Sequence, residues 1–353
     1  MKQIKYKSNL LKALFFSILL IFTSPIRAEI KVVTTIKPLH SLISNVMDGV
    51  GNPSLIIEGS TSPHSFTLKP SHAKLLEEAD IIFWVGEGME TFMERPLESI
   101  VKKAEVISFM ELESINKLKF REESIFGDHD DHDDHGDHDD HEEDHDDHDD
   151  HEEDHDDHDD HDEDHDDHDD HDEDHDDHDG HEGHNHGEFD AHIWLDPMNA
   201  KEMVHEIAHE LSHLDPVNKD KYNANAEATN LALDEMIDDI SQNINKDAKF
   251  VVFHDAYQYF EERFGIRAAG ALTLNTDVLP GAKQIDEIQD VIKDKGINCI
   301  FSEPQFNPKI ISTISEDTNI KTGVFDPLGA NINSDKSLYF KLINNLSEEL
   351  KGC

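Results

Sequence analysis

Short apolar runs alternate with longer amphipathic stretches along most of the chain. In the first half, β-branched or fully apolar runs of strand length are separated by stretches of helical length. The predicted strands are 30–35, 54–57, 81–85 and 105–109, and the predicted helices are 39–47, 71–78 and 88–94. Strands that alternate with helices in this way predict a mostly parallel sheet.

The same alternation returns after residue 247. The predicted strands are 250–253, 297–301 and 321–325, and the predicted helices are 256–264, 282–295, 308–316 and 338–350. Between the two halves, Asp196-Pro197 and Asp215-Pro216 each combine a preferred N-cap residue with Pro at the first helical position. They predict one helix that ends near residue 214 and a second, roughly over 217–245, that is about 40 Å long.

These elements indicate an α/β protein with two lobes, each built on a mostly parallel sheet, joined by one long helix. The N-terminal lobe is expected to take residues 29–127 and 189–214, the linking helix residues 215–246, and the C-terminal lobe residues 247–353. Ligands of such folds bind beyond the carboxyl ends of the strands. We therefore expect a binding cleft between the lobes.

The acidic charge of the chain is concentrated in one segment. The chain of 353 residues holds 80 Asp and Glu against 30 Lys and Arg, a formal net charge of −50, and residues 128–188 contain 37 of these acids and 19 of the 27 His without a Lys or Arg. Such a charge excludes ordinary nucleic-acid binding and disfavours docking on an anionic membrane surface. Outside the segment, the charge balance is that of an ordinary globular protein.

The segment 128–188 repeats with a period of ten residues. His141, His151, His161 and His171 each begin a near-copy of H-x-E-D-H-D-D-H-D-D. Dense like charge without apolar residues predicts a disordered insert. An acidic spacer alone does not require so many His, whereas imidazole binds Zn²⁺ and its neighbours well. We therefore expect a flexible insert that binds several divalent ions weakly; a solvated acidic spacer is the alternative.

The N-terminus has the pattern of an export signal. Lys2, Lys5 and Lys7 precede an apolar run over residues 10–22, and Ala28 offers a small residue for cleavage. A short membrane anchor is the alternative, but the run is too short to span a bilayer comfortably. We expect residues 1–28 to be a signal peptide, cleaved near Ala28. The two cysteines, Cys299 and Cys353, are then expected to form a disulfide rather than remain as two unpaired thiols.

Three His outside the insert lie where a predicted strand ends or a loop begins. His64 lies in a loop, His192 shortly before the Asp196 helix cap, and His254 directly after the strand 250–253. Asp326 follows the strand 321–325 in the same manner. Three neutral imidazoles and one oxygen ligand make a tetrahedral zinc site, although a lone His is more often a hydrogen-bonded structural residue.

A rival motif lies on the predicted helix after Pro197. His205-Glu206-x-x-His209 matches H-E-x-x-H, and the pattern repeats from His209 to His213. An exported zinc metalloprotease is therefore an alternative function. Against it, the apolar positions of the helix turn the His row towards solvent, and the extended third-ligand pattern is missing from the sequence. We favour a solvent-facing row that binds metal weakly; a stand-alone extracytoplasmic metal buffer is a third hypothesis.

Several longer motifs together carry a specific resemblance that covers the whole mature chain. They are T-T-I-K-P-L from Thr34, H-S-F-T-L-K-P-S from His64, A-D-I-I-F-W-V-G from Ala79, H-I-W-L from His192, V-F-H-D-A-Y from Val252, E-P-Q-F from Glu303 and D-P-L-G from Asp326. With these motifs and its His-rich insert, the chain resembles the zinc/manganese substrate-binding protein family. Within that family it is similar to the ZnuA-type periplasmic zinc-binding components of high-affinity zinc ABC importers.

The resemblance implies that His64, His192 and His254 bind zinc. Manganese-binding members have a carboxylate at the third position, so His254 favours Zn²⁺. Several relatives place a fourth ligand where Asp326 stands, while others use water or an acid just before the first His. In this chain Pro63 stands just before the first His and cannot be a ligand. Asp326 or water therefore remains as the expected fourth ligand. The pairing of Cys299 with Cys353 also resembles the disulfide of that family.

The resemblance also implies the function. We expect the chain to capture Zn²⁺ in the periplasm as a transported ligand and to deliver it to the permease of a zinc ABC importer. It is expected to act as a monomer, without stable membrane insertion, without nucleic acid and without catalysis. His40 and His72 lie near the matching motifs and are interpreted as non-ligands.

Overall fold

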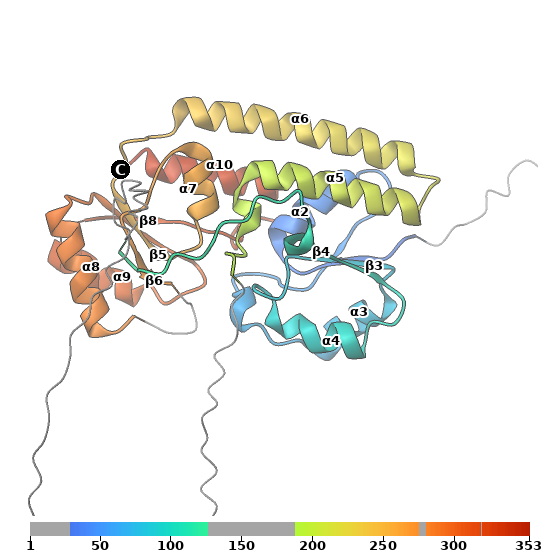
Figure 1. Ribbon diagram of the computed structural model, residues 1–353, viewed down its shortest axis with the longest axis horizontal. Coiled ribbons are helices and arrows are strands. Elements are labelled where there is room, and N and C mark those ends of the chain that lie inside the picture. Colours follow the sequence, from blue (N-terminus) through green and yellow to red (C-terminus); the bar gives the residue numbers. More distant parts are fainter. Residues whose placement is uncertain (1–28, 126–187, 275–279, 319) are drawn as a thin grey trace, which may run out of the picture. The chain divides into compact units, whose positions relative to one another are not determined.

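The computed structural model describes residues 29–125, 188–274, 280–318 and 320–353. Within these ranges the chain forms two four-stranded sheets surrounded by helices (Figure 1). The expected signal peptide and, apart from Glu188, the expected His-rich insert lie outside the described residues. Across the described ranges, every helix is too short or too polar to cross a membrane.

The first sheet has the strand order β2-β1-β3-β4, and all its pairings are parallel. Its strands are β1 Val32–Thr34, β2 Ser54–Leu55, β3 Ile81–Trp84 and β4 Glu105–Ser108. Val33 of the inner strand β1 is paired with Ser54 on one side and Ile82 on the other. All four residues of β3 are buried, which explains its unbroken apolar sequence.

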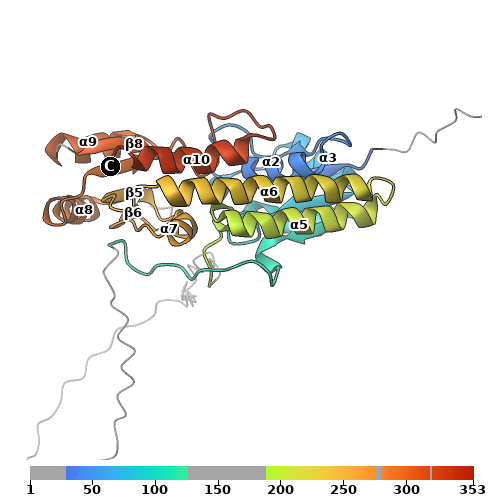
Figure 2. The ribbon, with the colours of Figure 1, turned by 90° about the horizontal axis from the view of Figure 1, so that it is seen from above.

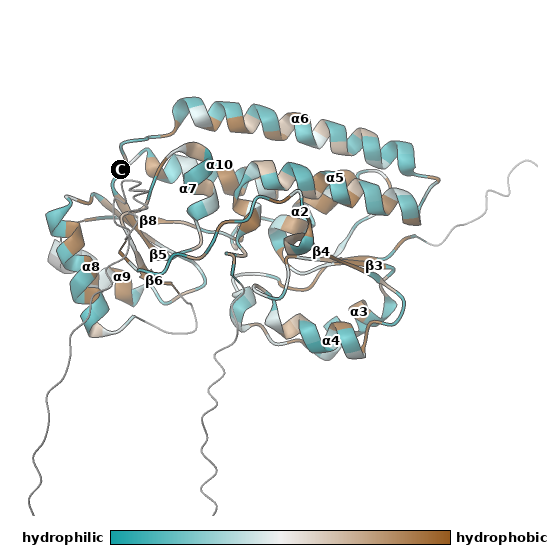
Figure 3. Ribbon diagram, viewed as in Figure 1, coloured by the Kyte–Doolittle hydropathy of each residue, from teal (hydrophilic) through white to brown (hydrophobic). Residues whose placement is uncertain are grey.

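The second sheet repeats this arrangement with the order β6-β5-β7-β8, again with parallel pairings. Its strands are β5 Phe250–His254, β6 Ala271–Thr273, β7 Cys299–Ser302 and β8 Lys321–Val324. Figure 3 shows the inner strands in the brown of apolar residues. Cys299 of β7 forms a disulfide with Cys353, as expected from the cysteine count. The α/β fold with two parallel sheets is therefore confirmed.

The helices complete both lobes. They are α2 Lys37–Val46, α3 Pro70–Glu78, α4 Glu94–Ser99, α5 Pro197–Leu214, α6 Lys219–Asn243, α7 Gln258–Phe264, α8 Ala282–Asp294, α9 Lys309–Thr318 and α10 Leu338–Leu350. The long helix α6 packs against α2, α5 and α10. Figure 2 shows α5, α6 and α10 running side by side. The helix α10 packs against both α2 and α6, and the disulfide of Cys353 links the segment after it to β7, so α2, α6 and α10 pack together across the two halves of the chain.

The helix α6 buries only a narrow stripe, which explains its modest apolar content. The buried residues recur every three or four positions: Tyr222, Ala226, Thr229, Leu233, Met236 and Ile240. That spacing places them on one face of the helix. The other positions are mostly polar, although Leu231 is exposed, and most of α6 is teal in Figure 3.

The predicted helix over 88–94 is wrong. This stretch is a turn followed by the short 3-10 segment Thr91–Met93, and the helix α4 begins only at Glu94. The buried carboxylate of Glu90 accepts hydrogen bonds from the backbone amides of Val85 and Gly86, both at 3.0 Å. Tertiary burial of one acidic side chain therefore overrides the local helical pattern.

The predicted cap at Asp215-Pro216 is also wrong. The helix α6 begins at Lys219, after Asn218. One carboxylate oxygen of Asp215 accepts from Asn218 Nδ2 at 2.6 Å and from the hydroxyl of Tyr222 at 3.1 Å. Asp215 thus ties the turn to the new helix through side chains instead of capping an amide. At the first Asp-Pro pair the prediction is confirmed, because Asp196 accepts from the amide of Met198.

Candidate metal centre

Three His side chains from distant parts of the sequence gather in one place. A ring nitrogen from each of His64, His192 and His254 lies within 4.8 Å of those of the other two. His192 and His254 are buried, and His64 is half-buried. The structure therefore brings together three of the four predicted ligands.

Each His is positioned by the local structure around it. His64 lies in the 3-10 turn Pro63–Ser65, where the side chain of Ser62 accepts from the amide of His64 at 3.3 Å. His192 precedes the turn Ile193–Leu195 that leads into α5. His254 is the last residue of β5, at the carboxyl end of a parallel strand. Ligands of open α/β sheets bind at this end of the strands.

The geometry of the three rings suits one small cation. Nε2 of His192 and Nε2 of His254 are 3.2 Å apart. Two nitrogens bound tetrahedrally to Zn²⁺ lie about 3.3 Å apart, given a metal–nitrogen distance of about 2.05 Å. The cavity that the rings line has a volume of about 10 Å³, which is room for about one water-sized sphere. The site is therefore the size of an ion and too small for an organic substrate.

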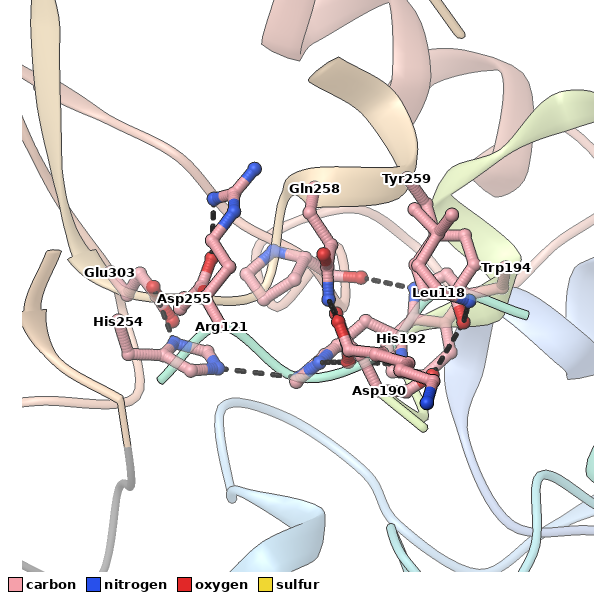
Figure 4. A network of polar contacts seen from close by, with 12 residues as sticks. Leu118, Arg121, Asp190, His192, Trp194, His254, Asp255, Gln258, Tyr259 and Glu303 are labelled. Atoms are coloured by element: carbon pink, nitrogen blue, oxygen red, sulfur yellow. Dashed lines mark hydrogen bonds and ion pairs between the residues drawn. The ribbon is translucent and has the colours of Figure 1, made fainter. Parts of the chain in front are cut away.

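Two buried carboxylates fix the rings. Nδ1 of His192 is 2.6 Å from Oδ1 of Asp190, and Nδ1 of His254 is 2.7 Å from Oε1 of Glu303. When each Nδ1 donates to its carboxylate, the lone pair of Nε2 faces the other ring (Figure 4). Carboxylates that hold metal-binding His in this way set the tautomer and increase the basicity of the ligand.

The roles of Asp190 and Glu303 were not predicted from the sequence. Asp190 lies two residues before His192, and Glu303 follows β7 directly. Two features of the sequence could have indicated these roles. One is a carboxylate next to a candidate ligand, and the other is a carboxylate at the carboxyl end of a neighbouring strand. Their significance depends on packing that the sequence pattern does not encode.

Further polar contacts hold Asp190 itself. Its second oxygen, Oδ2, accepts from Gln258 Nε2 at 2.6 Å, and its backbone carbonyl accepts from the hydroxyl of Tyr259 at 2.6 Å. Both donors belong to the α7 helix of the second lobe. The support for His192 thus comes from the same lobe that provides His254.

A half-buried arginine balances part of the negative charge behind the rings. Arg121 donates to Asp255 at 2.8 Å and to Glu261 at 2.6 Å. Burial raises the pKa of Asp255 to about 7; Arg121 acts in the opposite direction, while Glu261 and Asp190 raise it further. Arg121 thus pairs with Asp255 and Glu261, while Asp190 and Glu303 are the buried carboxylates that contact the rings. Negative charge beside the rings attracts a cation.

The electrostatics of His254 follow from this field. Burial acts to lower the pKa of His254, but Glu303, Asp255 and Asp190 together outweigh it, so the pKa is raised. The neighbouring Tyr257 is fully buried, and its pKa is raised well above its usual value by burial and by Glu303 and Asp326. Tyr257 therefore stays neutral beside the site.

Asp326, the fourth predicted site residue, is placed differently. Its Oδ1 accepts from Gln305 Nε2 and from the amide of Leu328, both at 3.2 Å, and its Oδ2 accepts from the amide of Ala330 at 2.6 Å. Among the described residues, the metal-binding group around His64 does not include Asp326. The carboxylate instead organises the loop after β8.

His40 and His72 make contacts of their own. Nε2 of His40 is 3.2 Å from the carbonyl of Pro53, and Nδ1 of His72 accepts from the amide of Lys69 at 3.2 Å. Burial lowers the pKa of both rings. Neither ring belongs to the His64 group.

The His row of the rival motif lies on the outside of α5. His205, His209 and His213 are all exposed, as the apolar stripe of the helix predicts. The second candidate metal-binding group of the described residues is Glu206, His209 and Glu210. It does not combine His205 with His209, as H-E-x-x-H zinc binding requires.

Comparison with known proteins gives a consistent result. Residues 32–353 match the family described as "ZnuA: Zinc-uptake complex component A periplasmic". The "High-affinity zinc uptake system protein ZnuA" of Brucella abortus strain 2308 is 46% identical over 324 residues, 91% of each chain. The protein of the same name from Yersinia pestis is 31% identical over 351 residues, 99% of each chain.

Solved structures show the same fold. The crystal structure of a zinc-bound ZnuA deletion mutant superimposes with a TM-score of 0.64 at 19% identity and covers 92% of this chain and 98% of its own. At that identity the likeness concerns the fold alone, whereas the sequence match covers nearly the whole chain. The chain therefore belongs to the family of ZnuA periplasmic zinc-uptake components.

Proposed function

We propose that this protein captures one Zn²⁺ ion with His64, His192 and His254 and delivers it to the membrane permease of a zinc ABC importer. The convergence of three imidazoles on an ion-sized cavity is the observation that carries the proposal. The names of the relatives, which are zinc-uptake proteins, agree with it.

The donor set favours zinc over harder cations. Imidazole suits Zn²⁺, Cu²⁺ and Ni²⁺, whereas Mg²⁺, Ca²⁺ and Mn²⁺ prefer oxygen ligands. His254 supplies a third nitrogen. Asp190 and Glu303 contact the rings and do not belong to the group of three donors, although Glu303 also lines the cavity. A site with three neutral His and one open position is a known arrangement for zinc.

We propose that water occupies the fourth coordination position of the ion. Asp326 already accepts two hydrogen bonds from amides of its own loop and a third from Gln305. Its release would leave the amides of Leu328 and Ala330 without their acceptor, which costs free energy when the groups are buried. A water ligand also leaves the ion exchangeable, as delivery to a permease requires.

Release of the ion requires only a small movement of the lobes. His64 is supplied by the first lobe, and His254 by the second. The helix α6 packs against helices of both lobes, so it resists wide opening and permits a limited rocking motion. A separation of the rings by about 1 Å already breaks a geometry based on bonds of about 2 Å.

The His-rich segment 128–188 is proposed to collect zinc weakly for the site. The described chain on both sides of the segment is held by isolated β-bridges. Before the segment, Ile125 forms a β-bridge with Gly270, and after it, Phe189 forms a β-bridge with Lys119. Asp190 and His192 come immediately afterwards. The chain therefore passes from the insert into the metal centre within a few residues. The signal peptide over 1–28 is proposed to direct the protein to the periplasm.

The protein is proposed to have no catalytic step. If the H-E-x-x-H motif were catalytic, Glu206→Gln would abolish peptide hydrolysis and leave zinc bound, because the glutamate is the general base. We expect no peptidase rate in the unchanged protein. A rate that disappears in Glu206→Gln would replace transport with proteolysis.

Zinc stoichiometry tests the proposal. Titration of the full chain is compared with titration of a chain that lacks residues 128–188. Several weak equivalents are expected to disappear with the deletion, and one tight equivalent is expected to remain. Loss of the tight equivalent would identify the segment 128–188 as the primary site, contrary to the proposal.

A further inference from the structure

The exposed face of α5 carries four potential metal donors outside the metal centre. They occupy positions i, i+3, i+4 and i+7 of the helix: Glu206, His209, Glu210 and His213. At 100° per residue they fall within an arc of about 100° on the helix surface. Side chains at these spacings are neighbours.

Their geometry points to a common ion. One donor atom each from Glu206, His209 and Glu210 lies within 4.8 Å of the other two. The ring of His213 lies in the next turn, with its centroid 4.5 Å from that of His209. The four side chains therefore combine two imidazoles and two carboxylates on one patch.

One of these contacts brings two donor atoms to the spacing of a shared ion. Nδ1 of His209 is 2.9 Å from Oε1 of Glu210. Two donor atoms bound tetrahedrally to one Zn²⁺ lie about 3.3 Å apart, so this nitrogen and this oxygen can hold the same ion. Glu206 and Glu210 are also like charges at i and i+4, an arrangement that is unfavourable without a cation.

The patch is open to ions from solution. His209 and His213 are exposed. Together with His205 they line a groove of about 540 Å³ between α5 and α6, whereas Glu206 and Glu210 do not belong to its lining. This volume admits a hydrated cation, whereas the metal centre has room for about one sphere of water size.

We propose that Glu206, His209 and Glu210 form a second, exposed site for Zn²⁺ or a similar late transition-metal ion. The site differs from the metal centre in every ligand. His213 is not one of its ligands, because it lies two turns from Glu206, about 10 Å along the helix. His205 is not one either, because it does not belong to the group of three donors. Exposure and water ligands make the site weaker than the metal centre and rapidly exchanging.

Site-resolved chemical labelling in the full chain tests the proposal. Diethyl pyrocarbonate modifies free imidazole nitrogens, and mass spectrometry of the tryptic peptide between Lys201 and Lys219 resolves its three His. Labelling rates are measured while free Zn²⁺ is raised in a metal buffer, and Mg²⁺ serves as the comparison ion because it prefers oxygen ligands. Zn²⁺ is expected to slow the labelling of His209 about fivefold or more, because metal binding removes the free nitrogen lone pair that reacts. Mg²⁺ is expected to have no effect.

Two variants assign the donors. In the double variant Glu206→Gln and Glu210→Gln, protection by Zn²⁺ is expected to be lost at the same free zinc concentration. The matched control, His205→Ala, removes an exposed His from the same helix and is expected to leave protection of His209 unchanged. Unchanged labelling of His209 with saturating Zn²⁺ would overturn the proposal, and so would protection that survives the double variant or is lost in His205→Ala.

Discussion

Nε2 of His192 and Nε2 of His254 lie 3.2 Å apart, although the residues are separated by 62 positions in the sequence. Each ring is held from behind by a buried carboxylate, Asp190 or Glu303. The two nitrogens are thus almost at the separation that tetrahedral zinc requires, about 3.3 Å. The protein therefore provides a metal geometry that needs little rearrangement on binding.

The carboxylate of Glu303 is predicted to contribute to zinc affinity through His254. Glu303→Gln retains the size of the side chain and an acceptor oxygen but removes the charge that supports the ring. The affinity of the tight site is expected to fall about 10- to 100-fold, as for other supporting residues of metal sites. Competition with a chromophoric chelator measures the change.

Glu348→Gln is the matched control for this variant, because Glu348 is exposed on α10. It is expected to bind zinc like the unchanged protein. Equal affinities for Glu303→Gln and the unchanged protein would show that the Glu303–His254 contact has no part in metal binding.

The carboxylate of Asp326 is predicted not to be a ligand. Asp326→Asn retains an acceptor for part of the loop contacts and is expected to change zinc affinity by less than about tenfold, or 1.4 kcal/mol. The same chelator competition measures it. A loss comparable with that of a His variant would instead assign the fourth coordination position to Asp326.

The buried Glu90 is predicted to make folding stability depend on pH. Burial raises its pKa to about 7, against the opposing effect of hydrogen bonds from Thr35, Gly86 and Val85. The folded state therefore binds a proton that the unfolded state, with a pKa near 4.5, has already lost. The contribution of Glu90 to stability is full below about pH 4.5 and declines as the pH rises through about 7.

Glu90→Gln tests this linkage, because glutamine is neutral at every pH. The free energy of unfolding in urea is measured for both proteins at pH 5 and at pH 8. The difference between variant and unchanged protein is expected to move in favour of the variant at pH 8, by at most about 3 kcal/mol. A difference that does not vary with pH, or that favours the unchanged protein more at pH 8, would contradict the assignment.

The disulfide is predicted to stabilise the second lobe without influencing the metal centre. Cys299 and Cys353 close a loop with a sequence separation of 54. In the chain-entropy account, loss of this link costs about 2 to 4 kcal/mol. Cys353→Ser is therefore expected to lower the urea midpoint while one tight zinc equivalent is retained. Equal midpoints for the variant and the oxidised unchanged protein would show that the link contributes nothing.

The sequence predicted most of the strands and helices because their hydrophobic patterns are local. The helix α10 was predicted with its observed bounds, and β3 and β5 to within one residue at each end. The strand β6 was missed because its three residues, Ala271–Thr273, follow a stretch of small residues without alternation. The turn around Glu90 was missed because its cause is a buried carboxylate and not a local pattern.

The metal centre was predictable in part for a similar reason. Each of the three His lies where a strand ends or a loop begins, and the sequence identifies such positions: His64, His192 and His254. The contacts of Asp190 and Glu303 with the ring nitrogens were not predicted, because they form only when segments distant in the sequence pack together. For Asp326, position after a strand suggested a ligand, while the structure uses both of its oxygens for the following loop.

Zinc affinity of the ring variants tests the central claim most directly. Chelator competition on the full chain is compared for the unchanged protein, His192→Ala, His254→Ala and the control His205→Ala, which removes an exposed His from α5. One tight equivalent is predicted for the unchanged protein and for the control, and a loss of affinity of about 100-fold or more for His192→Ala and for His254→Ala. Tight binding that is unchanged in both ring variants would contradict the assignment of the metal centre.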